Sequence, residues 1–483
     1  MTNLKRNTVL LTGSGMVEFG LQFLIPIIFV RHLDPNAFGQ YRLLWLVAGT
    51  ALALAPAFMP QSLFYFLPRT SRDQRAVPIG NVIAYLSVAG LGVALCTSKW
   101  NPLLPENIAN LFILSGGISS VFLGLWIVVS IMTVLPIAEE RITWQVRSDI
   151  SLSLLRTVLL ATAAIMTQQL IWVLTALLIE AVARIGTLIL YLHSSTVTRL
   201  RINWKTMRTQ LRYALPFAAG NALFQLRSVA DQWIIASILS PSLFGLFSIS
   251  SVFLSLTALI RQPVCNAIMP RLTRSYASGD LDDFVCLFRK SCVVTTLLLV
   301  MLGGTLLCVT RELVEIVYTE RYSKAVPVMH IYLITMMVQG CSAGYLLPVL
   351  NRAGFAVFNN LTCLTISAVS SYVGTLIWGL PGAACGGLIA FAISELWSLN
   401  VIARALQVSL YDLVPWMSLL KFAFACVFGF LIVALTMDEL QSSPFIQLTI
   451  KSAVYLTAFI TLILIIDGSP DISLLRRTST NQS

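Results

Sequence analysis

Polar side chains inside apolar stretches are the part of this sequence that can do chemistry. The stretch 211–246 is apolar enough for a bilayer, yet six polar residues interrupt it. At 100° per residue these six fall on one arc, about 160° wide, of a single predicted helix. Insertion scales assign roughly 2.5 to 3.5 kcal/mol to one charged side chain at the bilayer centre. The arc is therefore predicted to face water, a protein partner or a cargo. Its members are Asn221, Gln225, Arg227, Ser228, Asp231 and Gln232.

Further ionisable residues lie well inside other apolar stretches. Guanidinium groups keep their charge and match the oxygens of an anion in pairs. A carboxylate at membrane depth can take up and release H⁺ or Na⁺, because burial raises its pKa. The predicted anion-binding residues are Arg227, Arg156, Arg184 and Arg261, with Asn221, Gln225 and Gln22 as polar support. The predicted ion-coupling residues are Glu18, Asp231, Glu180 and Glu395.

Several of these charges have a simpler structural explanation. Glu180 and Arg184 are four residues apart with the acid first, the favourable order for an ion pair within one helix. Arg227 either meets the cargo or neutralises Asp231, and Glu18 either carries a coupling ion or holds an arginine in place. Arginine and lysine near a helix end can extend to the membrane surface. This last explanation applies to Arg261, Lys421 and Lys451.

The composition places the chain among multi-pass membrane proteins. Of its 483 residues, 57% are hydrophobic and only 11% are charged, well outside the range of soluble domains. The net charge of +11 is scattered between apolar stretches, which argues against nucleic-acid binding. The nine cysteines stand singly, without metal-ligand spacing. We therefore expect no metal and no bound cofactor.

The distribution of apolar stretches predicts an all-α protein with roughly 14 transmembrane helices, at about 20 residues a crossing. Among them, 39–67 and 213–239 are each predicted to be one span. Lysine and arginine number about 20 on one side and about six on the other, which predicts that both termini are cytoplasmic. The cytoplasmic basic residues include Arg72, Arg141, Arg199, Arg208, Arg476 and Arg477.

Two copies of one turn motif indicate an internal repeat. The pattern L-x-P-x-x-F-G-x-aromatic occurs at 33–41 and again at 239–247, each time between the first two spans of a half. An even number of spans per half makes the copies parallel, related by an axis along the membrane normal. The predicted domains are an N-terminal six-helix bundle (1–192), a basic cytoplasmic linker (193–212), a C-terminal six-helix bundle (213–404) and a helix pair with a cytoplasmic tail (405–483).

With this motif and span count, the chain resembles the multidrug/oligosaccharidyl-lipid/polysaccharide (MOP) exporter superfamily. Within that superfamily it is most similar to the O-antigen (Wzx-type) polysaccharide-synthesis flippases. The resemblance implies two bundles around a V-shaped central cavity, which opens alternately to either side of the membrane. It also implies a cargo, a polyprenyl-diphosphate-linked oligosaccharide that moves from the cytoplasmic to the periplasmic leaflet. The location that it implies is the cytoplasmic (inner) membrane of a bacterium.

Three function classes follow from these observations. The preferred one is a flippase, not an enzyme, that serves O-antigen, capsule or exopolysaccharide synthesis. Its partners would be polysaccharide polymerases and glycosyltransferases, and a monomer suffices. A membrane-embedded polymerase or glycosyltransferase is the second class, although the outer loops are short for catalysis. The third class is a cation-coupled drug exporter of the same fold, for which an acidic, aromatic cavity is expected instead of one rich in arginine.

Overall fold

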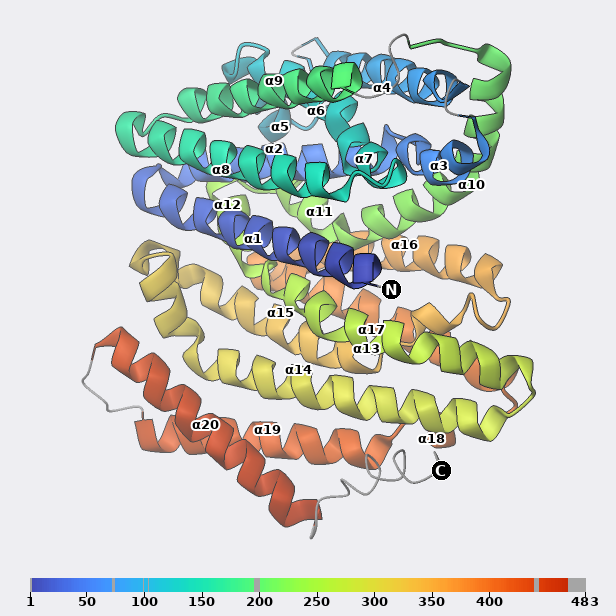
Figure 1. Cartoon of the computed structure of the whole chain (residues 1–483). Helices are drawn as coiled ribbons and strands as arrows, with labels where there is room; N and C mark the ends of the chain where they lie inside the picture. The colour runs from blue at the N-terminus through green and yellow to red at the C-terminus, as the bar shows by residue number, and fades with distance from the viewer. Residues whose placement is uncertain are drawn as a thin grey trace. The chain divides into compact units, whose positions relative to one another are not determined.

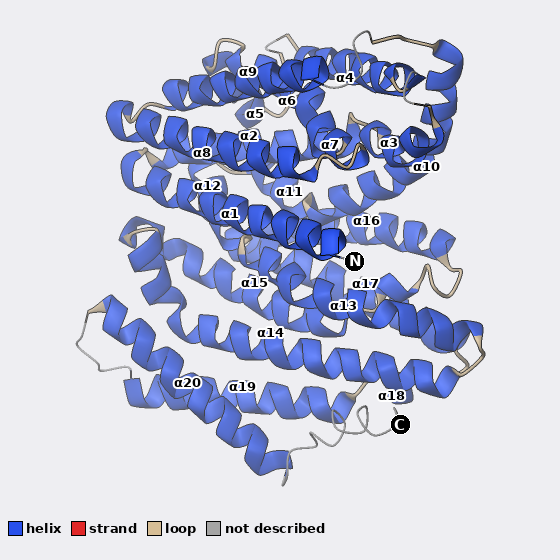
Figure 2. Cartoon of the chain, in the orientation of Figure 1, coloured by secondary structure: helices blue, strands red, loops and turns tan. Residues whose placement is uncertain are grey.

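The computed structural model describes residues 2–71, 74–98, 100–102, 104–194, 200–437 and 443–467. These residues form helices and loops, and Figure 2 shows no strand among them. Thirteen of the described helical segments are long and apolar enough to cross a membrane. The prediction of an all-α, multi-pass membrane protein is thus confirmed, whereas the count of about 14 spans stays a prediction. Arg72, Arg199 and the predicted tail, with Arg476 and Arg477, lie outside the described residues.

The chain divides into two compact units, Met1–Gly245 and Leu246–Ser483, here called the N-terminal and the C-terminal unit. The helices of the N-terminal unit are α1 (Thr2–His32), α2 (Pro35–Leu54), α3 (Met59–Phe66), α4 (Ala76–Cys96), α5 (Glu106–Leu114), α6 (Ile118–Val129), α7 (Leu135–Ala138), α8 (Ile142–Thr167), α9 (Leu170–Ser194), α10 (Trp204–Ser228) and α11 (Ala230–Ile238). The unit boundary falls inside α12 (Pro241–Ser250).

The helices of the C-terminal unit are α13 (Phe253–Ala277), α14 (Leu281–Val317), α15 (Val326–Val338), α16 (Ala353–Trp378), α17 (Leu380–Ala405), α18 (Leu410–Leu413), α19 (Trp416–Met437) and α20 (Pro444–Asp467). The helices α10 and α11 pack on α2, α3, α4 and α5 of the N-terminal unit. The compact units therefore divide the chain after α11. The predicted domain boundary at 193–212 follows the sequence repeat, and it stays a prediction.

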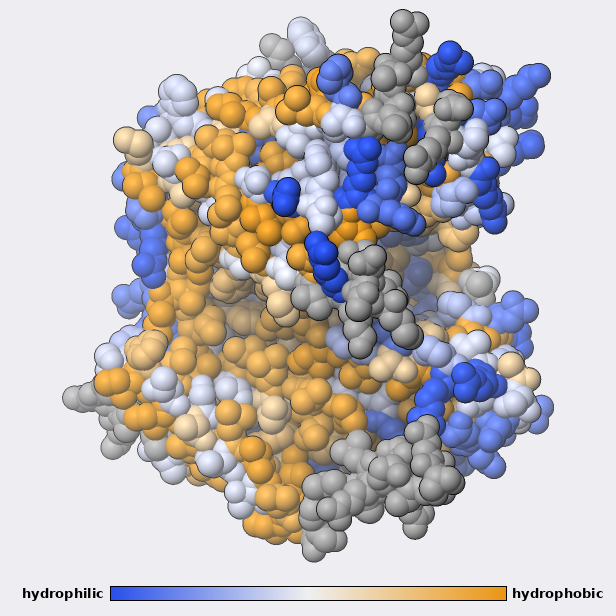
Figure 3. All heavy atoms as spheres, viewed as in Figure 1, coloured by the Kyte–Doolittle hydropathy of each residue, from blue (hydrophilic) through white to orange (hydrophobic). Residues whose placement is uncertain are grey.

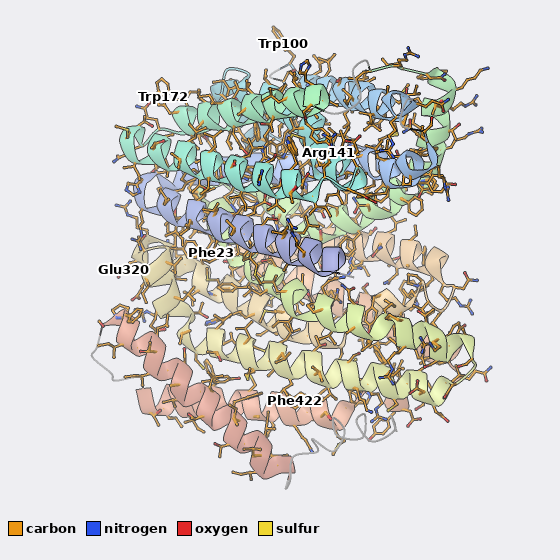
Figure 4. All side chains as sticks on the ribbon, in the orientation of Figure 1. Phe23, Trp100, Arg141, Trp172, Glu320 and Phe422 are labelled. Carbon is orange, nitrogen blue, oxygen red and sulfur yellow. The ribbon has the colours of Figure 1, made fainter. Side chains whose placement is uncertain are left out.

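The helical hairpin of α8 and α9 shows how polarity follows the helix ends. Figure 1 shows the two helices side by side, with α1 next to α8. Arg141 lies where α8 begins, and Trp172 lies at the opposite end of the hairpin (Figure 4). On the visible face, hydrophobic atoms cover the middle of these helices and hydrophilic atoms gather towards the ends (Figure 3). This is the pattern of helices with an apolar belt and polar or amphipathic ends at the membrane surface.

Two of the predicted spans contain a helix break. Pro35–Arg69 is nevertheless one candidate span, as predicted for 39–67, whereas the single helix predicted across 213–239 is wrong. The span 39–67 separates into α2 and α3 because Ala57 and Phe58 adopt positive φ angles of 46° and 59°, which a right-handed helix cannot contain. The span 213–239 separates into α10 and α11 at Val229, whose φ of −122° and ψ of 13° end the first helix. The predicted polar arc therefore crosses a helix break.

The two copies of the turn motif meet inside the N-terminal unit. A Cβ atom on Gly39 would lie 1.8 Å from the carbonyl oxygen of Pro241, and one on Gly245 would lie 3.2 Å from the Cα of Gly39. Only glycine allows the two backbones to approach this closely. The glycine of each motif is thus explained by the other copy.

We predict that Gly39→Ala destabilises the N-terminal unit by about 1–3 kcal/mol, because the added methyl group overlaps backbone atoms that cannot move independently. The measurement is the thermal unfolding midpoint of the purified protein in detergent. Gly49→Ala is the matched control, since it lies in the same helix with no atom within 4 Å of its Cβ position. Equal midpoints for the two variants would contradict the contact.

A buried ion pair fixes α20 in the C-terminal unit. Figure 1 shows α19 and α20 beside α14, and Lys451 of α20 donates to Glu312 of α14 over 2.5 Å. Both side chains are largely buried. The prediction that Lys451 extends to the membrane surface is therefore wrong. Its charge has a carboxylate partner on a neighbouring helix, the usual arrangement for a charge inside a bilayer.

Candidate functional site

A cavity of about 540 Å³ lies within the N-terminal unit. Its wall is built from α1, α2, α3, α6, α8 and α9, together with the break between α2 and α3. The size is within the range of pockets for small molecules or single sugar residues. The polar and aromatic residues of the wall include Glu18, Gln22, Tyr41, Arg42, Trp45, Gln61, Trp126, Arg156 and Arg184.

Two of the predicted arginines share one buried carboxylate behind this wall. Arg184 donates from Nε to Glu180 over 2.7 Å, and the Nε of Arg156 lies 3.9 Å from the other Glu180 oxygen. Glu180 is fully buried. The expected pair of Glu180 and Arg184 is present, and Arg156 joins it from the neighbouring helix. A buried carboxylate of this kind is stabilised by its cations, and it holds them in fixed positions.

The hairpin register explains why Arg156 and Glu180 meet. Each lies twelve residues from Gln168, which adopts a positive φ at the end of α8. At 1.5 Å per helical residue, both lie about 18 Å from the turn. At the other end of the hairpin, Tyr191 of α9 donates a hydrogen bond to Glu139, which follows α7 and precedes α8 by three residues. This bond connects α9 to the segment that leads into α8.

Tryptophan rings hold the planes of the two guanidinium groups. The Cζ of Arg156 lies 4.5 Å from the ring centre of Trp45, and that of Arg184 lies 4.9 Å from the ring centre of Trp126. The two rings contact each other edge-on, with 5.8 Å between their centres. Stacking of this kind strengthens when water is excluded. The Nε atoms of both groups face Glu180, so a ligand would have to bind to the terminal N–H bonds.

Three buried polar atoms of the wall residues have no hydrogen-bond partner in the described part of the chain: Trp45 Nε1, Gln61 Oε1 and Arg156 Nε. Buried polar atoms are normally paired. Of the three, Arg156 Nε faces Glu180 at 3.9 Å, so Trp45 Nε1 and Gln61 Oε1 are the two atoms of these residues left without a partner in the described part of the chain.

Glu18 and Gln22 reach the same wall from α1. Gln22 donates to Glu18 over 3.1 Å, so the two residues form one polar position next to the arginines. The structure thus brings together Glu18, Gln22, Arg156 and Arg184 in one wall, with Glu180 behind it. Their roles in ion coupling and in binding stay predictions.

The remaining predicted residues lie elsewhere. Asn221, Gln225 and Arg227 belong to α10 and Asp231 to α11, and none of them is part of this wall. Asp231 is buried and accepts a hydrogen bond from the backbone N–H of Gln232. In the C-terminal unit, the candidates are Arg261 in α13 and Glu395 in α17.

Glu395 has a visible structural task in the C-terminal unit. It accepts hydrogen bonds from the hydroxyl of Ser342 and from the backbone N–H of Ala343, each over 2.9 Å. These two residues follow α15, where the helix gives way to short 3₁₀ segments. Glu395 therefore stabilises the irregular backbone that follows α15. An additional role in ion coupling stays a prediction.

Four residues of the wall were not predicted from the sequence: Arg42, Trp45, Gln61 and Trp126. Arg42 had a detectable signal, because it is a charge inside the apolar stretch 39–67. The tryptophans had none, since an aromatic residue in a membrane helix is ordinary packing material unless its neighbours are known.

We predict that Glu180→Gln lowers the stability of the N-terminal unit by about 3–5 kcal/mol, the cost of leaving buried partner charges without compensation. The measurement is again the thermal unfolding midpoint in detergent. Glu315→Gln is the matched control, because it removes the acid of an exposed pair with Arg311 and should cost about 0–1 kcal/mol. A Glu180→Gln protein as stable as this control would show that Glu180 does not hold the two arginines.

Comparisons with known proteins agree with this architecture. A family model described as "polysaccharide biosynthesis protein" matches residues 28–327. No curated protein matches the chain in sequence. Among solved structures, the chain is similar to the lipid II flippase MurJ in an inward closed conformation. The TM-score is 0.68 at 13% identity, over 95% of this chain and 98% of that one.

Two further solved structures share the fold. One is an inward-facing multidrug resistance MATE family transporter of the MOP superfamily, with a TM-score of 0.63, 11% identity and coverage of 83% and 99%. The other is a MOP superfamily transporter from Pyrococcus furiosus Vc1, with a TM-score of 0.53, 13% identity and coverage of 84% and 97%. These identities establish a shared fold and nothing about the cargo.

Proposed function

This chain belongs to the polysaccharide biosynthesis protein family, and on that premise we propose that it is a flippase for a lipid-linked oligosaccharide. The cargo is a glycan on a polyprenyl diphosphate, carried from the cytoplasmic to the periplasmic leaflet by alternating access. The product serves the synthesis of a surface polysaccharide. The fold, shared with MOP superfamily transporters, supports transport in preference to catalysis.

The observation that carries this proposal is the arginine-lined cavity of the N-terminal unit. Arg156 and Arg184 lie near the middle of α8 and α9, which is the middle of the bilayer for helices that span it. An anionic headgroup cannot enter hydrocarbon without compensation. Guanidinium edges fixed by Trp45, Trp126 and Glu180 provide that compensation, while the polyprenyl chain stays in the lipid.

The proposal also covers the coupling ion, the membrane in which the protein lies and its partner proteins. A carboxylate at membrane depth binds H⁺ or Na⁺ as the cavity changes sides, and Glu18 is the best placed candidate because it lies in the cavity wall. Both termini are cytoplasmic in a bacterial inner membrane. Polymerases and glycosyltransferases of the same pathway are the expected partners, and one copy of the chain is sufficient.

A cation-coupled drug exporter is the second candidate. It is favoured by the fold of the MATE transporter and by an aromatic wall that contains Glu18. Three arginines in that wall, Arg42, Arg156 and Arg184, oppose it, because they repel the organic cations that an acidic cavity would select.

The test is a flipping assay in proteoliposomes. We predict that the wild-type protein moves a fluorescent polyprenyl-diphosphate oligosaccharide between leaflets. We expect Arg156→Gln to slow this about tenfold, as one charge-assisted hydrogen bond is worth about 1.5–3 kcal/mol. This variant keeps the bond between Glu180 and Arg184, so the hairpin retains its main pair.

Arg311→Gln is the matched control, because it removes an exposed arginine of the C-terminal unit. It should flip the lipid at the wild-type rate. A wild-type protein that leaves the lipid-linked sugar in place but transports ethidium would instead establish the drug exporter.

A further inference from the structure

We propose that one surface of the N-terminal unit binds the headgroups of anionic phospholipids. It consists of the described part of the basic linker and the first half of α10, residues 200–212, and is here called the linker surface. These residues are separate from the cavity wall, so the inference goes beyond the proposed function and does not depend on the cargo. It is carried by a fixed backbone, a set of exposed cations and exposed apolar side chains beside them.

Buried polar contacts hold the linker surface against the start of α4. The backbone N–H of Arg201 donates to the carbonyl oxygen of Ala76 over 3.3 Å. The fully buried side chain of Asn81 accepts from the backbone N–H of Asn203 over 2.9 Å and donates to Gln210 of α10 over 3.0 Å. The linker surface therefore has a defined shape and a defined outer face.

The first half of α10 runs across the long helices of its unit. In Figure 1 it passes down the right-hand side, across the direction of α4 and α8, before the chain turns inward as the second half of the helix. Pro216 lies inside α10, and proline is a usual cause of a helix bend. A helix that crosses the ends of membrane-spanning helices has the orientation of an interfacial helix, parallel to the membrane surface.

The outer face of α10 carries three cations. At 100° per residue, Lys205, Arg208 and Arg212 fall within an arc of about 60°, and all three residues are exposed. Gln210, on the opposite face, is fully buried. No acidic residue occurs in 195–230, and the three cations form no ion pair within the described part of the chain. Their charges are therefore available to an anion outside the protein.

Exposed apolar side chains lie next to these cations in the sequence. Leu200, Ile202 and Trp204 are 43%, 67% and 69% exposed. By contrast, Met207 and Leu211 of the same segment pack on the apolar core of the unit. An indole ring has an apolar body and a polar N–H, and it is enriched where headgroups meet acyl chains. Tryptophan and aliphatic residues beside lysine and arginine are the composition of a segment that lies in this interface.

Together these features fit a bilayer that contains anionic phospholipid. The apolar side chains enter the region below the headgroups, while the cations meet the phosphates. Each lysine or arginine near an anionic leaflet strengthens the attraction about fivefold, or about 1 kcal/mol. A soluble acidic protein would match the cations as well. The bilayer around the spanning helices, however, supplies both the charge and the apolar contact.

The test measures which lipid contacts Trp204 in nanodiscs that hold the purified full chain without any cargo. Phosphatidylcholine and phosphatidylglycerol are mixed in a fixed ratio, with brominated acyl chains on one lipid or on the other. Bromine quenches a nearby indole, so the quenching that is lost in Trp204→Phe reports on this side chain. We predict that phosphatidylglycerol has a binding constant at Trp204 at least about tenfold above that of phosphatidylcholine. This preference should disappear at about 1 M salt, where charges are screened within about 3 Å.

Variants assign the preference to the cations. Arg208→Gln should lower the relative binding constant of phosphatidylglycerol about fivefold, while phosphatidylcholine still quenches Trp204. The double variant Lys205→Gln/Arg208→Gln should remove the preference altogether. The matched control is Arg147→Gln, which removes an exposed arginine from the second turn of α8 and should keep the full preference.

Each other outcome overturns the inference. Equal binding constants for the two lipids would show that the linker surface lies in the bilayer without selecting a headgroup. Equal quenching of the wild type and Trp204→Phe would place this side chain outside the bilayer and assign the linker surface to a soluble acidic partner. A preference that survives the double substitution would belong to another part of the chain.

Discussion

The site depends on the ion pairs that the buried carboxylate of Glu180 forms with Arg156 and Arg184. Two guanidinium groups within one apolar unit repel each other, and each is costly to remove from water. Glu180 lies between them, fully buried, and receives a hydrogen bond from Arg184 while it faces Arg156. With this carboxylate the pair retains a single net positive charge at the middle of α8 and α9. The stacking on Trp45 and Trp126 then fixes where that charge is directed.

The backbone supplies the space that this charge requires. The break between α2 and α3 gives the wall Pro56, Pro60 and Gln61, where a continuous helix would present only one side. Two consecutive residues with positive φ maintain the break, and conformations of this kind persist only when the surrounding packing holds them. Phe58 stacks on Phe217 of α10, with 5.5 Å between the ring centres, and provides such packing at the break.

The sequence was sufficient for the fold class and for part of the site. Composition and apolar stretches identified the membrane helices, and the i,i+4 spacing identified the pair of Glu180 and Arg184. The meeting of Arg156 with Glu180 was not predicted, because it depends on the position of the turn at Gln168, which periodicity does not give. The break at Ala57 has a signal in the sequence, because Pro56 and Pro60 on either side of it interrupt a helix. The break at Val229 was missed, because no glycine or proline lies next to it. The surface position predicted for Lys451 was wrong because its partner, Glu312, lies 139 residues away in the sequence. Helical periodicity predicts neighbours within one helix and not contacts between distant helices.

The pair of Lys451 and Glu312 has a consequence for any shortened form of this protein. A chain ended before α20 would lose the ammonium group and retain the carboxylate, now inside α14 with hydrocarbon where its neighbour had been. That carboxylate would have to become protonated or draw water inward. α20 therefore cannot be removed without leaving the carboxylate of Glu312 unpaired. Without α20, the buried carboxylate of Glu312 would destabilise the C-terminal unit wherever it is charged, and acid would relieve this cost.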